Sequence, residues 1–412
     1  MEPIQEKKNP FYRLGCRGFQ TGMRAAAYLL PFRTPRLMQG AGSIRRLPGA
    51  IRKMGISRVL VITDPGISRQ DFLRELLSNL ERNEVAWSLY DKTVVNPTID
   101  NIEQAADLYR RSKCQAILAV GGGSPIDCAK AAAARIAKPG QPVSRMKGVL
   151  KVHKKLPVLI AVPTTSGTGS EVTIAAVVTD AVSKEKYAIT DTSLTPRYAV
   201  LDPVLTKDLP KFMTATTGMD ALTHAVEAYI GRSNTGKTKK YAWRAVRIIF
   251  RDLERVYENG QNLLLRENMQ KAAYFAGAAF TRAYVGYVHA LAHALGGMYG
   301  TPHGLANAVI LPYVLEYYGE AVYQPLSELA DVAGIGMAEM TEAERADLFI
   351  AAIRRMNYNM GIPEHLSDIR EADIGLLSLR AAREANPLYP VPKILSRKDL
   401  AFLYSQIKGE QI

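Results

Sequence analysis

The sequence predicts an α/β domain with a mostly parallel sheet, followed by an all-helical domain. Two observations carry this prediction. Short apolar runs alternate with helical stretches through the first half of the chain, as in a sheet whose strands are joined by crossover helices. After about residue 206 the strand signals fade and helical periodicity continues alone. The length of 412 residues also fits two or three domains.

The strands and helices of the first half follow in regular order. The run "SRVLVITD" (57–64) is apolar, ends in an acid and precedes Pro-Gly, which is typical of a buried parallel strand. Similar runs predict strands over 86–91, 114–123, 156–165, 170–180 and 186–190. The stretches between them predict helices over 68–82, 98–113 and 124–137. We expect helices on both faces of the sheet.

The second half is helical throughout. After "YAVLDPVLT" (198–206) a period of 3.6 residues predicts helices over 214–230, 237–258, 268–282, 286–298, 305–318, 322–333 and 341–360. No internal repeat or low-complexity segment interrupts the chain. We therefore divide it into an N-terminal extension (1–35), an α/β domain (36–206) and a helical domain (207–412).

The N-terminal extension is basic and contains one short apolar run. That run is far shorter than the roughly 18 to 20 residues that span a bilayer. Arg24 interrupts it and Pro31 follows it, which is a poor match to a signal peptide. We expect an amphipathic helix packed on the body or on a second subunit, with attachment to a membrane surface as the alternative. No stable membrane insertion is expected.

Composition and charge narrow the class of protein. The chain is 47% hydrophobic, and its 53 basic and 39 acidic residues give a formal charge of +14. The basic stretch from Cys128 to Ser170 contains no acid. It predicts either a solvated loop or a field that attracts an anionic dinucleotide. No nucleic-acid reader motif accompanies the charge, so nucleic acid is not an expected partner. Three widely spaced cysteines fit a reducing cytoplasm.

Two glycine-rich loops follow predicted strands. In "AVGGGSPID" (119–127) three glycines lead into a helix, for which Ser124 is a suitable N-cap and Pro125 a suitable first residue. Glycines there let backbone N–H groups approach phosphate oxygens. The pattern is not GxGxxG, and a simple tight turn is the alternative. "VPTTSGTGSE" (162–171) offers Thr164, Thr165 and Thr168, and a surface turn is its alternative. Two such loops suit an extended phosphorylated ligand.

Asp64 ends the first predicted strand. An acid at this position accepts hydrogen bonds from ribose hydroxyls and repels a 2′-phosphate, which favours NAD over NADP. An ordinary turn aspartate before Pro-Gly is the competing interpretation.

The helical half contains a possible metal-binding constellation. Asp220 and His224 stand four residues apart on one helix, and Glu227 follows three residues later. His289 and His293 form a second such pair, with His303 ten residues beyond. One carboxylate with several imidazoles suits Zn²⁺ or Fe²⁺ better than Mg²⁺ or Ca²⁺. Spacing alone leaves open which four bind, and it favours using His289 and His293 together. "HALAH" lacks the glutamate of HExxH, which weakens a metalloprotease interpretation.

These motifs in this order resemble the iron-containing (group III) alcohol dehydrogenase family over 36–408. The resemblance is carried by Asp64 and by the following segments: "NPT" (96–98), "GGGSPID" (121–127), "PTTSGTGSE" (163–171), "DALTHAVEAY" (220–229), "VHALAHALGGMYGTPHGLANAVILP" (288–312) and "ANPLYPVP" (385–392). It implies the two-domain architecture shared with dehydroquinate synthase, and an active site in the cleft. It also implies hydride transfer between NAD(P) and a small alcohol or aldehyde with a divalent metal, usually Fe²⁺ and sometimes Zn²⁺. A homodimer is the family habit.

The resemblance also implies roles for individual residues. The metal ligands would be Asp220, His224, His289 and His303. His293 would stay unligated, face the nicotinamide and substrate, and carry a proton. The cofactor would be held by Asp64, Asn96, Gly122, Gly123, Ser124, Thr164, Thr165, Thr168 and Lys186. The first 35 residues lie outside the pattern. Ala175 stands where some members have an asparagine near the nicotinamide, so no role transfers to these positions.

Other functions remain open at this point. A lyase of the dehydroquinate-synthase type would pair NAD with a metal on the same scaffold. It would need basic residues near the metal for a phosphorylated substrate, and the helix of Asp220 and His224 has none nearby. A polyol oxidoreductase similar to glycerol dehydrogenase, and a non-enzymatic metal- or nucleotide-binding protein, are the further alternatives.

Overall fold

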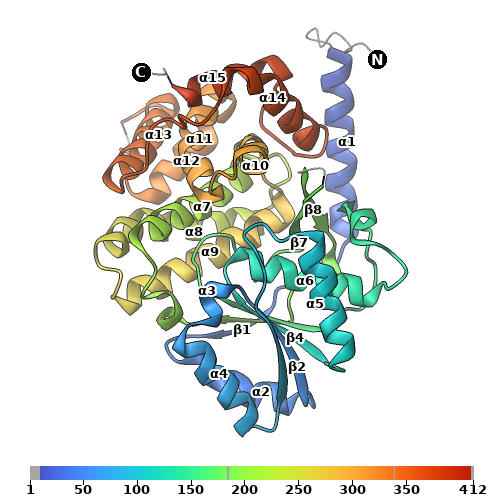
Figure 1. Cartoon of the computed structure of the whole chain (residues 1–412). Coiled ribbons are helices and arrows are strands. Elements are labelled where there is room, and N and C mark those ends of the chain that lie inside the picture. Colours follow the sequence, from blue (N-terminus) through green and yellow to red (C-terminus); the bar gives the residue numbers. More distant parts are fainter. Residues whose placement is uncertain (1–9, 183–184, 338, 410–412) are drawn as a thin grey trace. The chain divides into compact units, whose positions relative to one another are not determined.

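The computed structural model describes residues 10–182, 185–337 and 339–409. Contacts between residues divide the chain into two compact units, neither of which is continuous in sequence. The helical unit contains Met1–Leu30, Lys211–Glu258 and Arg282–Ile412, and the α/β unit contains Pro31–Pro210 and Asn259–Thr281 (Figure 1). Among the described residues, no helix combines the length and the apolar character that a bilayer crossing requires.

A six-stranded sheet forms the centre of the α/β unit. Its order is β1-β9-β6-β4-β2-β3, and every neighbouring pair is parallel. The strands are β1 (Arg36–Gln39), β2 (Arg58–Ile62), β3 (Ala86–Tyr90), β4 (Ala116–Gly121), β6 (Val158–Pro163) and β9 (Tyr198–Leu201). The central strands β4 and β6 are buried on both faces, which is why their sequences read as continuous apolar runs. The predicted parallel sheet is confirmed.

Helices cover both faces of this sheet, as predicted. One face packs against α2 (Leu47–Lys53) and α4 (Asp71–Arg82), with Val59 and Val61 of β2 pointing toward them. The other face packs against α5 (Ile99–Arg111) and α6 (Gly123–Ala137), with Leu60 and Ile62 on that side. The alternation within β2 therefore divides its apolar side chains between two cores.

The structure corrects several predicted elements of this unit. The strand expected at 170–180 shortens to β7 (Ala175–Asp180), and the strand expected at 186–190 is present as β8 (Glu185–Thr190). Both lie outside the main sheet. With β5 (Gly148–Val149) they form a small sheet in which β7 and β8 are antiparallel. β8 is only alternately buried, which distinguishes it from the central strands. The helix expected at 68–82 is α4, and a short helix that was not predicted, α3 (Pro65–Ser68), precedes it.

The helical unit contains the helices predicted there except the one at 268–282, together with two that the sequence did not predict. Their bounds are α7 (Lys211–Ile230), α8 (Gly236–Glu258), α10 (Tyr287–Tyr299), α11 (His303–Tyr318), α12 (Tyr323–Ala333), α13 (Glu342–Asn359), α14 (Glu371–Ala385) and α15 (Arg397–Lys408). α14 and α15 are the additions. α7 is buried from Thr214 to Ile230 along nearly every face, so it is the centre of this unit.

Helix α9 (Leu263–Ala283) supplies the segment Asn259–Thr281 that belongs to the α/β unit. Gly277 on α9 meets Gly169 of the second glycine loop, where an added Cβ on Gly169 would come within 2.7 Å of Gly277 Cα. Gly169 also has a positive φ of 61°. Glycine at these two positions allows a helix and a loop to pack backbone against backbone.

The N-terminal segment forms helix α1 (Pro10–Leu29). Arg17 donates hydrogen bonds to the carbonyls of Val391 and Pro392, both at 2.7 Å. Gln20 donates to the carbonyl of Tyr389 at 2.7 Å. The expected packing of an amphipathic helix on the body is therefore confirmed for the described part of this segment. The first nine residues of the predicted extension lie outside the described residues.

Candidate metal centre and nucleotide-binding loops

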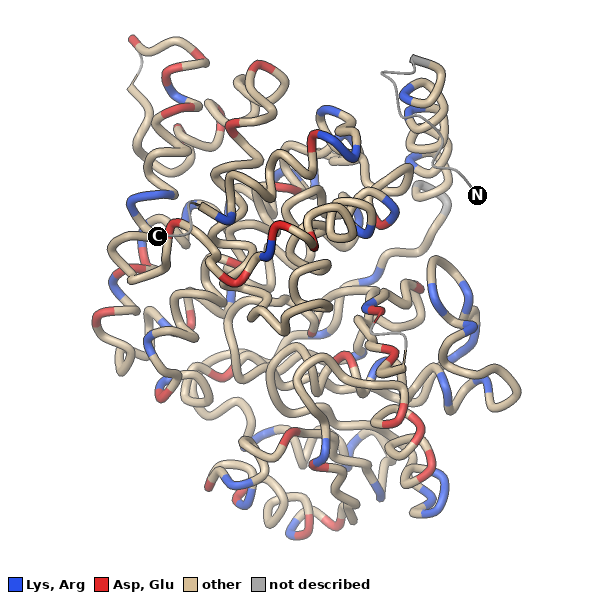
Figure 2. Tube along the Cα trace, turned by 45° about the horizontal axis from the view of Figure 1, so that its top comes forward, with Lys and Arg blue, Asp and Glu red and all other residues tan. Residues whose placement is uncertain are grey.

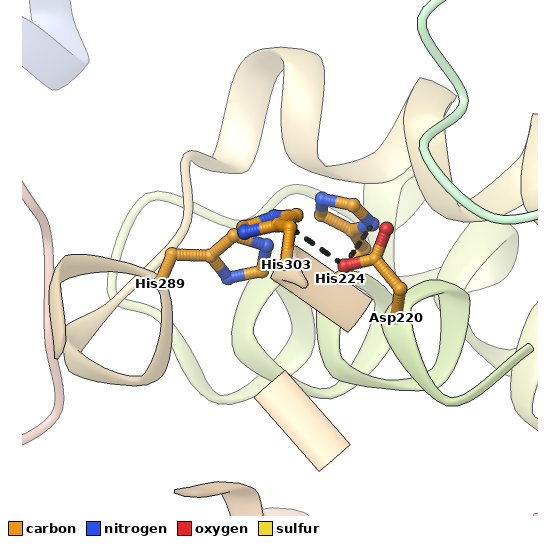
Figure 3. A group of neighbouring side chains, drawn as sticks. All are labelled: Asp220, His224, His289 and His303. Carbon is orange, nitrogen blue, oxygen red and sulfur yellow. Dashed lines mark ion pairs between the residues drawn. The ribbon is translucent and has the colours of Figure 1, made fainter. Parts of the chain in front are cut away.

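Four side chains of the helical unit converge on one point (Figure 3). Asp220 and His224 come from α7, His289 from α10 and His303 from the first turn of α11. One ligand atom from each lies within 4.8 Å of the others. Asp220 Oδ1 is 3.5 Å from His303 Nε2 and 4.0 Å from His224 Nδ1. Three imidazoles and one carboxylate are a donor set that suits Fe²⁺ or Zn²⁺.

A buried glutamate orients one of these imidazoles. Glu227 Oε2 lies 2.5 Å from His289 Nδ1, so the opposite ring nitrogen, Nε2, is turned toward the cluster. Glu227 also accepts hydrogen bonds from the backbone N–H groups of Gly286 and Val288. An added Cβ on Gly286 would come within 2.7 Å of Glu227 Oε1. A carboxylate behind a histidine is the usual arrangement by which proteins fix a metal-binding ring.

Asn307, one turn after His303 on α11, reaches the centre of the cluster. Its Nδ2 donates to Asp220 Oδ1 at 2.7 Å and lies 3.1 Å from His303 Nε2 and 3.3 Å from His289 Nε2. One donor atom thus meets three of the four candidate ligands at once. This geometry shows that the ligand atoms face a common point.

His293 has its own carboxylate. Its Nδ1 lies 2.6 Å from Glu384 Oε1 on α14, and Tyr389 donates to the same oxygen at 2.7 Å. Burial and the Glu384 charge raise the pKa of Tyr389, which keeps this hydroxyl a donor. The ring of His293 stacks on that of His303 with centroids 5.0 Å apart. His293 therefore lies beside the cluster but is held by a different partner.

The two glycine loops meet at the carboxyl ends of β4 and β6. Thr164 N donates to Gly121 O at 3.0 Å. An added Cβ on Gly123 would come within 2.9 Å of Thr168, and one on Gly122 within 3.4 Å of Thr165. The predicted cofactor residues of both loops are thus brought together, with the N-terminus of α6 beside them. Backbone N–H groups at a helix N-terminus favour a phosphate group.

The start of α6 differs from the prediction. Gly122 is its N-cap, so the helix begins at Gly123 and Ser124 lies within the first turn. Ser124 Oγ instead accepts a hydrogen bond from Asn96 N at 3.2 Å. Asn96 has a positive φ of 57°, a conformation that asparagine tolerates better than most residues. The structure therefore brings a third loop, with Asn96, to the glycine pair.

Asp64 serves as the N-cap of α3, accepting from Gly66 N and Ile67 N through Oδ1. The turn interpretation of this residue is thus correct. Its second oxygen, Oδ2, lies 3.4 Å from the position that a Cβ on Gly121 would take, so Asp64 borders the first glycine loop. Asp64 can hold the turn with one oxygen and keep the other for a ligand hydroxyl.

A buried network ties the two loops together, and the sequence analysis did not find it. Asp127 of α6 accepts from Ser170 Oγ at 2.5 Å and from Val177 N at 3.0 Å. Lys130 is fully buried and donates to Ser170, to Thr173 at 2.7 Å and to Ala175 O. Burial raises the pKa of Asp127, and the charges of Lys130 and Lys186 oppose that rise. Lys186 of β8 is thus electrostatically coupled to this network.

The residues of this network share a feature that is visible in the sequence but does not identify their partners. Asp127, Lys130 and Glu171 are charges within otherwise apolar or small-residue segments. Glu227, noted in the sequence beside His224, also lies on a helix with few other charged residues, and its partner proved to be His289 of another helix. Charges are rarely buried without partners, so such positions indicate a network. Which partners they meet depends on contacts between segments far apart in the chain.

The α/β unit has a parallel sheet with loops at its carboxyl ends that suit phosphate groups. The helical unit has a cluster of three histidines and one carboxylate. These two features together define a class of metal-dependent oxidoreductases. The family comparison agrees. Residues 34–203 match the model described as iron-containing alcohol dehydrogenase, and residues 214–407 match its C-terminal counterpart. The chain belongs to the iron-containing alcohol dehydrogenase family and is an oxidoreductase.

Individual relatives and solved structures give the same result. The chain is 36% identical to 1,3-propanediol dehydrogenase of Klebsiella pneumoniae over 357 residues, covering 86% of this chain and 92% of the relative. It is 31% identical to NAD-dependent methanol dehydrogenase of Bacillus methanolicus over 372 residues, covering 90% and 97%. A crystal structure of 1,3-propanediol oxidoreductase superimposes with a TM-score of 0.88 at 34% identity, covering 92% of this chain and 99% of that one.

Proposed function

We propose that the chain is an NAD-dependent, metal-dependent alcohol dehydrogenase or aldehyde reductase for small primary alcohols and aldehydes. The convergence of Asp220, His224, His289 and His303 carries the proposal. The two glycine loops and the NAD dependence in the name of the Bacillus methanolicus relative support the cofactor. Small alcohols in the names of both relatives support the substrate class. A homodimer, expected from the resemblance, and a cytoplasmic location, expected from the cysteine pattern, stay predictions.

The four side chains are the residues that would hold the metal, either Fe²⁺ or Zn²⁺. When bound, the metal supplies Lewis acidity toward the substrate oxygen, and NAD supplies the hydride acceptor or donor. The protein's own residues do the rest. Glu227 fixes the ring of His289, and Asp220 contributes the negative charge of the donor set. The apolar helices around them exclude water.

His293 is the residue proposed to move a proton. Its Nδ1 is engaged by Glu384, so Nε2 is the atom that can accept or release one. Glu384 would stabilise the imidazolium form while the proton is held there. The cofactor would be held by Gly122, Gly123, Ser124, Thr164, Thr165 and Thr168 at its phosphates, with Asp64, Asn96 and Lys186 at its riboses.

A reductase assay tests the function. The protein is purified with Fe²⁺ or with Zn²⁺, mixed with NADH and short aldehydes, and followed by the loss of NADH absorbance. The reverse direction uses methanol, 1,3-propanediol and other short alcohols with NAD⁺. Turnover with at least one metal is expected. No turnover with any metal, together with metal binding that survives both His224→Ala and His303→Ala, contradicts the proposal.

The choice of NAD over NADP rests on Asp64. The ratio of kcat/KM for NAD and NADP is compared in the wild type and in Asp64→Gly. Loss of the carboxylate removes repulsion toward a 2′-phosphate, so the ratio should shift toward NADP. An unchanged ratio would show that Asp64 does not determine the preference for NAD over NADP. Because Asp64 also caps α3, circular dichroism should accompany the kinetics.

A further inference from the structure

A cavity of about 580 Å³ lies in the α/β unit at the amino ends of three neighbouring strands. Its walls come from 31–33 ahead of β1, from 153–159 at the start of β6, and from Arg197 directly before β9. The loop 191–195 completes it. The volume falls within the range of roughly 300 to 1,000 Å³ that is usual for small-molecule sites.

Positive charge dominates this cavity. Arg33, Lys154, Lys155 and Arg197 line it, together with His153. Figure 2, in which lysines and arginines are blue, shows how such residues are distributed along the chain. Elsewhere in the same basic stretch, Arg135 and Lys147 have glutamate partners. Within the described part of the chain, Lys154, Lys155 and Arg197 take part in no ion pair.

The acid that lines the cavity is Asp191, and groups of the surrounding loops form hydrogen bonds with both of its carboxylate oxygens. Oδ2 accepts from Val152 N and His153 N, and Oδ1 accepts from the backbone N–H and hydroxyl of Ser193. Burial raises the pKa of Asp191, but these hydrogen bonds outweigh it and hold the pKa below its usual value. Asp191 therefore shapes the wall, and Lys154, Lys155 and Arg197 remain available to an external anion.

The cavity is separate from the proposed cofactor loops. Those loops follow the carboxyl ends of β4 and β6, whereas Lys154 and Lys155 precede the amino end of β6. The six residues of β6 span about 20 Å at the usual rise of a strand. The dinucleotide therefore does not account for the charge here.

We propose that this cavity binds the phosphate group of a small anion. Arg197 offers a planar pair of donors that matches phosphate oxygens, and the two lysines add point charges. Arg33 adds positive charge, while its Nη2 donates to the carbonyl of Thr195 at 2.9 Å. Phe32, Leu156 and Pro157 give an apolar wall for an organic substituent. The concave shape and limited volume favour a small molecule over a nucleic-acid strand, which needs a long groove with successive stacking rings. Both free phosphate and a phosphate ester contain the group that is recognised.

Calorimetric titration tests this proposal on the full-length, metal-loaded protein with saturating NAD⁺, so that the cofactor loops are filled. The probes are inorganic phosphate and phenyl phosphate. The variants are Lys154→Gln/Lys155→Gln and, separately, Arg197→Gln. The control is Lys53→Gln/Lys398→Gln, which removes two exposed positive charges that lie outside the cavity. We expect saturable binding that at least one cavity variant weakens about tenfold or more and that the control leaves within about twofold.

The two probes distinguish the sources of the phosphate. Tighter binding of phenyl phosphate identifies an ester with an organic group against Phe32, and equal binding identifies free phosphate. The absence of saturable binding with both probes overturns the proposal. Unchanged affinity in both cavity variants also overturns it, because the anion would then bind elsewhere. An equal loss in the control overturns it as well, because the effect would then be one of net charge alone.

Discussion

His289 and His293 occupy successive turns of α10, yet their surroundings assign them different tasks. His289 is held by buried Glu227 and faces the donor cluster, whereas His293 is held by Glu384 on α14. The spacing of four residues predicts a shared face, and the ring centroids are indeed 6.0 Å apart. At the residue scale, the carboxylate behind each ring therefore separates the proposed ligand from the proposed proton carrier.

Substituting His293 should separate rate from metal content. His293→Ala should keep the metal and lower kcat by about 10²- to 10⁴-fold, because a positioned proton carrier contributes about that much. His224→Ala should lose the metal. Metal content by mass spectrometry and steady-state kinetics check both. A His293→Ala protein that loses its metal would make His293 a ligand after all.

Glu227 should matter for metal affinity although it lies behind a ligand. Glu227→Gln keeps the shape but weakens the hold on His289 Nδ1, so we expect metal affinity to fall about 10- to 100-fold. Competition with a chelator measures this affinity. Glu371→Gln, a change in an exposed pair with Lys408, is the matched control. Equal metal affinity in the wild type and in Glu227→Gln would show that Glu227 stabilises only the backbone of 286–288.

At the scale of elements, buried charged side chains of α6 stabilise the two glycine loops through hydrogen bonds. Lys130 on α6 reaches Ser170 and Thr173, and Asp127 on the same helix accepts from Ser170 and from the start of β7. Burial lowers the pKa of Lys130 to about 8 and raises the pKa of neighbouring Glu171 to about 7. The loops therefore rest on a polar network that is costly to disturb.

The raised pKa of Glu171 predicts a pH dependence of stability. The folded state binds this proton more tightly than the unfolded state, whose pKa is 4.5. The resulting stability is present below pH 4.5 and is lost as the pH rises through about 7. Glu171→Gln removes the titration, so the variant should gain about 3 kcal/mol relative to the wild type between pH 4.5 and 8. Denaturant unfolding at both pH values measures it, and a pH-independent difference would contradict the prediction.

The sequence pattern predicted the central elements, and the family resemblance implied the four donors, whereas spacing alone favoured His293 as a ligand. Neither predicted the residues that support the donors. Buried parallel strands such as β4 appear as continuous apolar runs, so they could be located. β1 is short and mostly exposed, and it has no such signal. Asp220 and His224 share a helix, so spacing could group them. The role of Asp127 could not be predicted from the sequence, because its partners 43 and 50 residues away follow from the tertiary fold.

At the scale of the whole molecule, the N-terminal helix lies before the family match, which begins at residue 34. Even so, it is connected to the functional residues of the helical unit. Gln20 donates a hydrogen bond to the carbonyl of Tyr389. The hydroxyl of Tyr389 donates to Glu384, whose carboxylate also contacts Nδ1 of His293. A segment without a role in the resemblance thus supports the residue proposed to move a proton.

Breaking this connection should affect both stability and rate. Arg17→Ala/Gln20→Ala leaves several carbonyls of 387–392 without donors and should lower the free energy of unfolding by about 3 kcal/mol. It should also lower kcat by about 2- to 30-fold, the range of mutations that act through intervening contacts. Metal content should not change. Arg13→Ala, an exposed change on the same helix, is the control. An unaltered kcat would limit α1 to a stabilising role.

Gly286 has a consequence for recognising this chemistry in other chains. It contributes no ligand, yet a side chain there would collide with Glu227 at 2.7 Å and push it away from His289. A homologue could therefore retain all four donors and still lose its affinity for metal through one methyl group in the backbone turn ahead of α10. A reliable signature should include this glycine and Glu227 as well as the four donor residues.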